Sequence, residues 1–261
     1  MHGALFVAKT GLSAQDTSLK IISNNLANVS TVGFKKDRAV FEDLMYQIQR
    51  QPGAQTAEDS QLPSGLQLGS GVRVAGTQKL FQEGELQTTG ESFDISIQGR
   101  GFWQVTMPNG DTGYTRHGQF QLNADNEIVN SEGYLLDPGL TLPSGVQSMS
   151  VSVDGIVSVV VQGDVNPQQI GQLQLADFAN PQGLQSYGQN LYLETAASGN
   201  AVLSNPGEGG TGQLRQGMLE GSNVNAVEEL VNMITTQRAY EMNSKVISTA
   251  DQMLSYVTQN L

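Results

Sequence analysis

The chain has 261 residues, no cysteine, two histidines, 30 glycines and a formal net charge of −12. This composition excludes disulfides, thiolate nucleophiles and cysteine-ligated zinc, and the acidity argues against nucleic-acid binding, because phosphate contacts need lysine and arginine. No stretch approaches the roughly 18 consecutive apolar residues of a membrane-spanning helix, so we expect no membrane insertion, and the N-terminal segment shows no cleavable signal peptide.

The two ends of the chain differ from its middle. All eight prolines lie between Pro52 and Pro206, and no glycine follows Gly221. Residues 1–50 carry six basic and four acidic side chains, residues 222–261 carry two and four, and the middle carries five and seventeen. Nearly neutral ends with few helix breakers favour packed helices. The acidic, glycine-rich middle is typical of a solvated domain.

The N-terminal segment repeats its apolar residues at helical spacing. Steps of three and four residues alternate through one series, with a single polar member: Leu5, Ala8, Leu12, Gln15, Leu19, Ile22, Leu26 and Val29. This heptad predicts a coiled-coil seam on a helix about 37 Å long.

The C-terminal segment has a similar but less regular stripe. Its first part is Val224, Val227, Val231 and Ile234, and after a five-residue step it continues with Ala239, Met242, Val246, Ala250, Met253 and Val257. We expect Ser222 or Asn223 to cap this helix, with Glu228 and Glu229 near the positive end of its dipole.

Both stripes need a partner, because a lone amphipathic helix is marginally stable in water. The helices either dock on the protein's own core or pair with each other and with further copies of the chain. Matched stripes at the two ends favour the second interpretation. We therefore predict a self-assembly seam made of Leu5, Ala8, Leu12, Leu19, Ile22, Leu26, Val29, Val227, Val231, Ile234, Met242, Val246, Met253 and Val257.

The middle of the chain is rich in short alternating segments. They predict strands over 93–97, 102–106, 114–122, 127–136, 149–163, 172–178 and 190–195, with hairpin turns at Asn109-Gly110 and Asp154-Gly155. This spacing indicates an antiparallel sandwich or barrel, and an α+β fold for the whole chain. Residues 47–71 and 198–213 are polar and broken by glycine and proline, so we predict irregular structure there.

No group of residues indicates catalysis or metal binding. The glycines at 207–212 lack the Lys-Ser/Thr of a phosphate-binding loop, and residues 123–127 lack the glycine and final glutamate of a calcium loop. Glu91 and Asp94 are interpreted as solvated carboxylates, and His117 as a structural residue. We predict a protein that is not an enzyme and that holds no cofactor or metal.

Four segments resemble the bacterial flagellar rod and hook proteins. Residues 23–36 (SNNLANVSTVGFKK) and 220–254 resemble the terminal motifs of this family, and residues 84–105 and 114–138 resemble its β-domain core. The resemblance covers most of the chain in the expected order, and Phe102-Trp103 departs from the two phenylalanines that are common in the family. The motif residues are Asn24, Asn25, Leu26, Ala27, Asn28, Gly33, Phe34, Ser222, Asn223, Val224, Arg238 and Tyr240.

The resemblance implies a structural subunit of a helical homopolymer. Residues 1–32 and 223–261 then form a discontinuous, coiled-coil-like inner domain for self-assembly, 33–71 a connecting segment with a distal-rod-type insertion, and 72–222 the β-rich outer domain. The chain length and the polar segment 47–71 favour the distal rod, a straight rigid tube that transmits motor torque to the hook and encloses the export channel. A proximal rod or hook subunit is the alternative.

The resemblance also implies location and partners. The subunit would be exported through the flagellar type III apparatus without a cleaved signal and would assemble in the periplasm, in the basal body. Its partners would be further copies of itself, proximal rod subunits, hook subunits, and the periplasmic and outer-membrane ring bushing. From the residues alone, a glycosidase using Glu91 and Asp94 and a carbohydrate-binding module stay open, but neither accounts for the matched helical ends.

Overall fold

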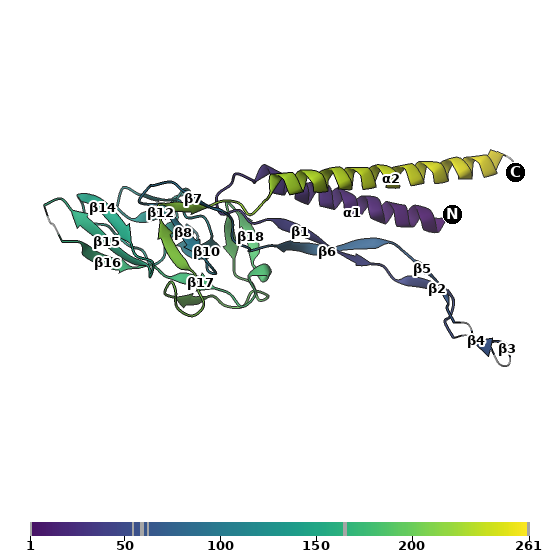
Figure 1. Cartoon of the computed structure of the whole chain (residues 1–261), viewed down its shortest axis with the longest axis horizontal. Coiled ribbons are helices and arrows are strands. Elements are labelled where there is room, and N and C mark those ends of the chain that lie inside the picture. Colours follow the sequence, from purple (N-terminus) through teal and green to yellow (C-terminus); the bar gives the residue numbers. More distant parts are fainter. Residues whose placement is uncertain (1, 54, 58–59, 62, 164–165, 260–261) are drawn as a thin grey trace. The chain divides into compact units, whose positions relative to one another are not determined.

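The computed structural model describes all residues except 1, 54, 58–59, 62, 164–165 and 260–261. The chain divides into two compact units. Unit 1 comprises Met1–Ala27, Asp37–Gln78 and Asn225–Leu261, and unit 2 comprises Asn28–Lys36 and Lys79–Val224. Both terminal helices belong to unit 1, while most strands belong to unit 2 (Figure 1), so the α+β prediction is confirmed.

Unit 1 contains the two helices, α1 (His2–Ala27) and α2 (Ala226–Gln259). They lie side by side (Figure 1), and they approach closely at Gly11, where an added Cβ would stand 3.0 Å from Asn243 Nδ2. The N-terminal helix was expected to reach Val29, but α1 ends two residues earlier, and turns follow. In the first of these turns Thr31 donates its N–H to the Asn28 carbonyl, which replaces the helical hydrogen-bond pattern.

The cap of α2 differs from the predicted Ser222 or Asn223. The Asn225 Oδ1 atom accepts the N–H groups of Val227 at 3.0 Å and Glu228 at 3.3 Å, so Asn225 is the capping residue. The side chain of Asn223 binds elsewhere, as described below. Both acidic residues of the first turn, Glu228 and Glu229, lie where they were predicted.

Unit 1 also contains a two-stranded β ribbon, which is formed by residues that follow α1 in the sequence. β1 (Asp37–Asp43) pairs with β6 (Val72–Lys79), β2 (Tyr46–Arg50) with β5 (Leu66–Gly69), and β3 (Gln55–Ala57) with β4 (Ser60–Gln61). The prediction of irregular structure over 47–71 was therefore wrong. The glutamines hide a period-two pattern, in which Tyr46 and Ile48 alternate with polar residues, and β2 and β5 remain exposed along their length.

Unit 2 is built from short strands that pair antiparallel. Its largest sheet has the order β11-β12-β13-β9-β10-β19-β18, a second has the order β14-β15-β16, and the two-stranded pairs are β17–β20, β8–β21 and β7–β22. The strand bounds are β7 Leu86–Thr88, β8 Ile95–Gln98, β9 Trp103–Thr106, β10 Thr112–Thr115, β11 Phe120–Leu122, β12 Ile128–Asn130, β13 Leu135–Leu136, β14 Val146–Val151, β15 Ile156–Val161, β16 Gln168–Gln172, β17 Leu175–Asp177, β18 Gln185–Gly188, β19 Leu191–Leu193, β20 Val202–Ser204, β21 Gln213–Gln216 and β22 Met218–Glu220, with a 3₁₀ turn, η1, at Pro181–Gly183.

The predicted strands of the middle occur, with corrections at three segments. The segment 127–136 is divided into β12 and β13, which pair with each other. The segment 114–122 is split into β10 and β11. There the Gly118 carbonyl accepts the Ile95 N–H, and Gly118 packs so closely against Ile95 that an added Cβ would clash with the Ile95 backbone. The segment 198–213 was predicted to be a loop, but β20 lies within it and pairs with β17. The hairpin turns at Asn109-Gly110 and Asp154-Gly155 are confirmed by positive φ values at both glycines.

The core of unit 2 lies on both sides of β9. Trp103 is fully buried in the larger apolar cluster with Ile95, Ile97 and Val157. Phe102, the preceding residue, packs in a second cluster with aromatic side chains, which include Tyr114, Phe178 and Tyr192. Consecutive residues of an extended segment point to opposite faces, so the Phe-Trp pair anchors both clusters.

Replacing Ile95 by alanine should lower the free energy of unfolding of unit 2 by about 2–5 kcal/mol, because its side chain is fully buried and would leave a cavity. The measurement is urea denaturation followed by fluorescence of Trp103, the only tryptophan. Val202→Ala is the control, because Val202 is exposed and should change stability by less than about 0.5 kcal/mol. Equal effects of both substitutions would contradict the assigned core.

Candidate functional site

Asn25, a residue of the N-terminal motif, binds three segments of unit 1 together. Its Nδ2 donates to the Asp37 carbonyl at 2.9 Å, and its Oδ1 accepts the Asp37 N–H at 2.9 Å. The same Nδ2 lies 3.3 Å from Glu229 Oε2 in the first turn of α2. Asn25 is 1% exposed, so these bonds are shielded from water and tie the end of α1 to β1 and to the start of α2.

Asn223, a residue of the C-terminal motif, does the same in unit 2. Its Oδ1 accepts the Lys36 N–H at 2.8 Å, and its Nδ2 donates to the carbonyls of Leu80 at 2.8 Å and Gln82 at 3.1 Å. The Leu80 N–H in turn donates to the Lys36 carbonyl at 2.9 Å. This network explains why Asn223 is not the helix cap.

Gly33 and Phe34 place the segment that leads to Lys36. Gly33 has φ +70°, and a Cβ there would stand 2.8 Å from the His117 backbone nitrogen, so only glycine fits. Its N–H donates to the Glu220 carbonyl at 2.8 Å. Phe34 is buried, and the Lys79 ammonium lies 5.3 Å from the centre of its ring.

A buried ion cluster lies between these motifs in unit 2. Lys35 Nζ donates to Glu220 Oε1 at 2.6 Å, and Arg116 Nε donates to Glu220 Oε2 at 2.9 Å. The exposed fractions of the Lys35, Glu220 and Arg116 side chains are 0%, 1% and 3%. The Lys35 ammonium also donates to the Gln82 carbonyl, and Arg116 Nη1 donates to the carbonyls of Gly99 and Gly101. The Gly84 N–H donates to Glu220 Oε1.

In this cluster the single carboxylate of Glu220 is paired with two cations, Lys35 and Arg116. Burial alone would raise the pKa of Glu220, but the charges and hydrogen bonds of Arg116 and Lys35 outweigh burial and lower it. For Lys35, burial lowers the pKa, Glu220 offsets this only in part, and the Arg116 charge adds to the lowering. Because each partner is stabilised by the others, loss of Glu220 would leave two buried charges without compensation.

His117 follows this cluster and lines a polar hollow of about 310 Å³ with Thr115, Asn190 and Glu132. Burial lowers its pKa, against the opposing charges of Asp94 and Glu132. The hollow brings together amide and hydroxyl groups, and Asn28 and Thr31 also line it. The interpretation of His117 as a structural residue stays a prediction.

The predicted seam residues of α1 are covered within the subunit to different degrees. Ala8 and Ile22 are buried, and Leu5, Leu12, Leu19 and Leu26 are half-buried. Val29, outside the helix, is half-buried as well. This face of α1 therefore already has partners in unit 1.

The predicted seam residues of α2 are exposed. The exposed fractions are 70% for Val227, 54% for Val231, 50% for Ile234, 64% for Met242, 49% for Val246 and 56% for Met253. The side chain of Val257 lies outside the described residues. The buried or half-buried face of α2 is a different one, with Glu229, Thr236 and Asn243. We call the exposed series, Val227 to Met253, the α2 apolar face.

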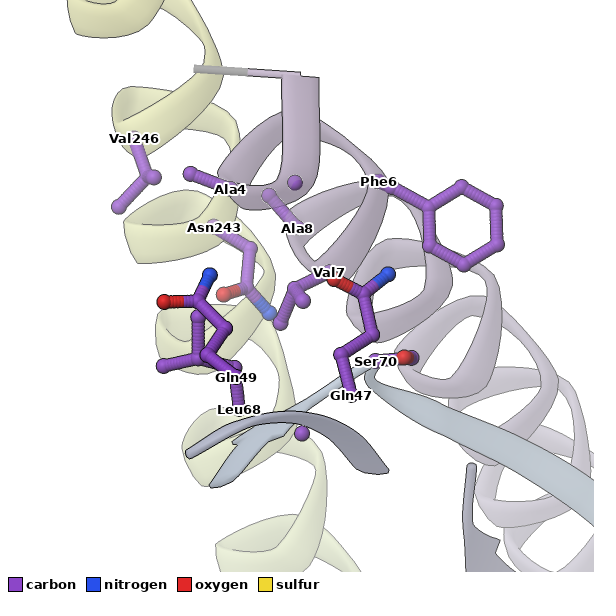
Figure 2. Close-up of a pocket in the computed structure, with 12 residues that line it drawn as sticks. Ala4, Phe6, Val7, Ala8, Gln47, Gln49, Leu68, Ser70, Asn243 and Val246 are labelled. Atoms are coloured by element: carbon purple, nitrogen blue, oxygen red, sulfur yellow. The ribbon is translucent and has the colours of Figure 1, made fainter. Parts of the chain in front are cut away.

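A hollow of about 900 Å³ opens in unit 1 between the helices and the ribbon (Figure 2). Ala4 and Val7 of α1, Leu68 of β5, and Asn243 and Val246 of α2 surround it. Its remaining lining residues are Gly3, Phe6, Ala8, Gln47, Gln49, Gly69 and Ser70. These lining residues are apolar or uncharged, so the hollow fits apolar or amide-bearing side chains and not an ionic ligand.

The other motif residues are spread over both units. Arg238 and Tyr240 are exposed on α2, Asn24 and Ala27 are exposed near the end of α1, and Asn28 is half-buried. Ser222 Oγ accepts the N–H of Val224, whose side chain is buried. The motifs thus combine residues that hold the segments together with residues that face solvent.

Sequence reasoning missed the ion cluster although its members lay within the quoted segments. Lys35 is the second-to-last residue of the N-terminal motif, and Glu220 is the first residue of the C-terminal one. Two charged residues 185 positions apart give no periodic signal. The one clue was their place beside Gly33 and Asn223, in segments that carry little hydrophobic pattern.

The described part of the chain contains no group of three or more histidine, cysteine or carboxylate side chains placed to hold a metal ion. Among the same residues, no helix is long and apolar enough to span a membrane. The interpretation of Asp94 as a solvated carboxylate was wrong, because Asp94 is buried, whereas Glu91 is exposed as expected. The Asp94 N–H donates to the Glu91 carbonyl, so these two residues form a local turn.

Family descriptions match three parts of the chain. "Flagella basal body rod protein" matches residues 5–35, "Flagellar hook protein FlgE/F/G D1 domain" residues 96–159, and "Flagellar basal body rod FlgEFG protein C-terminal" residues 215–260. These matches include Asn25, the ion-cluster residues Lys35, Arg116 and Glu220, and Asn223.

Curated relatives match along their whole length. A flagellar basal-body rod protein FlgG of Buchnera aphidicola subsp. Schizaphis graminum is 54% identical over 99% of this chain and 100% of its own. A FlgG of Caulobacter vibrioides is 47% identical over 98% of both chains. A flagellar basal-body rod protein FlgF from that bacterium is 33% identical, over 100% of this chain and 98% of its own. Within one organism, the chain is therefore more similar to FlgG than to FlgF.

Replacing Glu220 by glutamine should lower the free energy of unfolding of unit 2 by about 3–5 kcal/mol, because two buried cations lose their counter-charge. Lys35→Met should cost less, because it leaves one arginine paired with one carboxylate and keeps an apolar stem in place. Urea denaturation followed by Trp103 fluorescence compares the two variants. A larger loss for Lys35→Met than for Glu220→Gln would contradict the shared-carboxylate arrangement.

The ion cluster should also make stability depend on acidity. The pKa of Glu220 is lowered from the ordinary value of 4.5, so its contribution is fully present above that pH and is lost as the pH falls through the lowered pKa. We expect the stability difference between the natural chain and the Glu220→Gln variant to narrow from neutral pH to about pH 3. Denaturation curves across this range measure it, and a constant difference would refute the expectation.

Proposed function

Since this chain belongs to the bacterial flagellar rod and hook family, as a structural subunit of the distal rod, we propose that it polymerises through the α2 apolar face. The names of its relatives indicate a flagellar basal-body protein with a structural role. The observation that carries the proposal is the exposure of six predicted seam residues along one helix. Burying such side chains against a neighbour stabilises a complex by roughly 1.5–3 kcal/mol for each one fully buried.

Contacts through this face would let identical subunits form a tube. A contact between different surfaces of identical subunits, when the rotation does not close, generates a helical polymer. The helical ends of the chain are nearly neutral, which suits an inner layer where unpaired charge would be costly. Residues 1–32 and 223–261 would form this coiled-coil-like inner domain, and the acidic β-rich domain would form the outer wall.

The ribbon of unit 1 offers a second contact. Tyr46, Ile48, Leu66 and Leu68 are exposed on β2 and β5, and an isolated two-stranded ribbon is marginally stable in water. Packing of this ribbon on a neighbouring copy would stabilise it and stiffen the polymer. This supports a straight, rigid tube that transmits torque and encloses a channel.

We infer the partners and the location of the subunit from its family. We expect the rod to join proximal rod subunits at one end and hook subunits at the other, and to turn within the periplasmic and outer-membrane ring bushing. We expect delivery to the periplasm through the flagellar type III export apparatus, and no enzymatic activity. Basal bodies purified with and without this chain test these partners, since its loss should remove the hook and leave the proximal rod.

Replacing Met242 or Val231 by aspartate should abolish polymerisation and leave the subunit folded, because an exposed side chain contributes less than about 0.5 kcal/mol to subunit stability. Ser244→Asp is the matched control, since Ser244 is exposed on another face of α2 and the variant carries the same added charge. Ile48→Asp should allow polymers that bend more easily. Electron microscopy of the polymer and Trp103 fluorescence of the subunit are the measurements. Normal tubes from Met242→Asp would refute the proposal.

A further inference from the structure

The polar hollow beside His117 offers hydrogen-bonding groups that the fold of unit 2 does not use. It measures about 310 Å³, near the lower end of the range for small-molecule sites, about 300–1,000 Å³. The ends of β10 and β12 with the residues that follow them, the turn between β18 and β19, and the start of segment 28–36 line it. All of these segments belong to unit 2 and lie outside both helices. The hollow is therefore a feature of unit 2 alone.

Three side chains at the hollow have hydrogen-bonding atoms without a partner among the described residues. Asn130 is 7% exposed, and its Oδ1 accepts the N–H groups of Glu132 at 3.0 Å and Tyr134 at 2.8 Å. Its Nδ2 donates to no described residue, and the same holds for the His117 ring and the Ser131 hydroxyl. Since a buried amide nearly always has a hydrogen-bond partner, water or a ligand in the hollow must supply the acceptor for Asn130.

One wall of the hollow is held in place by a strained turn. Gln189 and Asn190 have φ +53° and +58°, a region that residues other than glycine seldom adopt. Gln189 Oε1 accepts the Tyr134 hydroxyl at 3.3 Å, and its Nε2 donates to Glu132 Oε2 at 3.3 Å. Asn190 Nδ2 donates to the Val32 carbonyl at 2.9 Å. These bonds fix the side chains of the turn before any ligand arrives, which lowers the ordering cost of binding.

The chemistry of the lining selects the class of ligand. Glu132 is the one charged group among the described residues that line the hollow, so an anion finds no cation there. Burial lowers the pKa of His117, so its ring is neutral near pH 7 and offers one donor and one acceptor. An ammonium or guanidinium group only donates, so it would leave the Asn130 donor unpaired. The fitting ligand is uncharged, and it both donates and accepts at neighbouring atoms.

The lining also argues against a protein partner. Protein interfaces have an apolar centre, and none of the large apolar side chains that are exposed in the described part of the chain lines this hollow. A small polar molecule fits better than a docked protein surface.

We propose that this hollow binds one ring of an uncharged saccharide. A sugar ring carries hydroxyls on adjacent carbons, and each hydroxyl donates and accepts, so neighbouring hydroxyls can pair with Asn130, His117 and Ser131 together. A free monosaccharide and a longer glycan present the same ring, and the test compares both. The site is separate from the α2 apolar face, so it neither requires nor excludes polymerisation.

The test uses the full-length subunit before polymerisation, with His117 as the reporter. The chain has two histidines, His2 and His117, so the ring-proton NMR signals that persist in His2→Ala belong to His117. The probes are glucose, N-acetylglucosamine and maltotriose, which are two single rings and one chain of rings. We expect saturable shifts of the His117 signals at millimolar sugar, because each hydrogen bond exchanged with water contributes little net free energy.

Two variants at one position test the site. Ser131→Ala should weaken binding about two- to tenfold, because it removes one hydroxyl, and Ser131→Phe should abolish binding by filling the hollow. Ser152→Ala is the matched control, since Ser152 is exposed on the turn between β14 and β15 and does not line the hollow. Trp103 fluorescence in urea shows that each variant stays folded.

Two further probes separate a sugar site from its alternatives. Glucuronate has the glucose ring with an added carboxylate and should bind more weakly, because Glu132 repels it. N-acetylglycinamide is uncharged and represents a peptide. No saturable shift with any of the three sugars would overturn the proposal, as would equal weakening by Ser131→Ala and Ser152→Ala, or tighter binding of glucuronate than of glucose. Saturable shifts with N-acetylglycinamide alone would also overturn it and would point to a peptide partner.

Discussion

The buried carboxylate of Glu220 is the interaction on which unit 2 depends most. It neutralises Lys35 and Arg116, accepts the N–H of Gly84, and its backbone carbonyl accepts the N–H of Gly33. Residues from the beginning, the middle and the end of the chain therefore meet at one charge. Since both cations are buried, unit 2 reaches its stable form only when the segment before α2 is in place.

The fold was predictable where a single period dominates the sequence. The helices and most strands of the middle follow from such periods. The ribbon at 47–71 was not predicted from the sequence. The segment is rich in glutamine and other polar residues, which obscure the alternation of apolar and polar residues that is typical of a strand. The cap of α2 was assigned to the wrong residue because Asn223 binds Lys36 and Leu80, which are far away in sequence, while Asn225 caps the helix. The early end of α1 coincides with the turn from Asn28 to Thr31.

The candidate site was predictable only in part, for a similar reason. The α2 apolar face could be read from spacing alone, since each member lies three or four residues from the next, apart from two longer steps. The ion cluster joins residues of three segments, and no local pattern reports such a contact. Resemblance marked the right segments, but the roles of Gly33 and Asn223 emerge only from the geometry.

The contact between α1 and α2 has a thermodynamic consequence. The covered face of α2 is built largely from small and polar groups, such as Thr236 and the Asn243 that meets Gly11, while valines, isoleucine and methionines face water. If subunits join through the proposed α2 apolar face, each addition buries these side chains while the contacts of the covered face of α2 are kept. Such burial lowers the heat capacity, so elongation should weaken on cooling, and cold should favour shortening of the polymer.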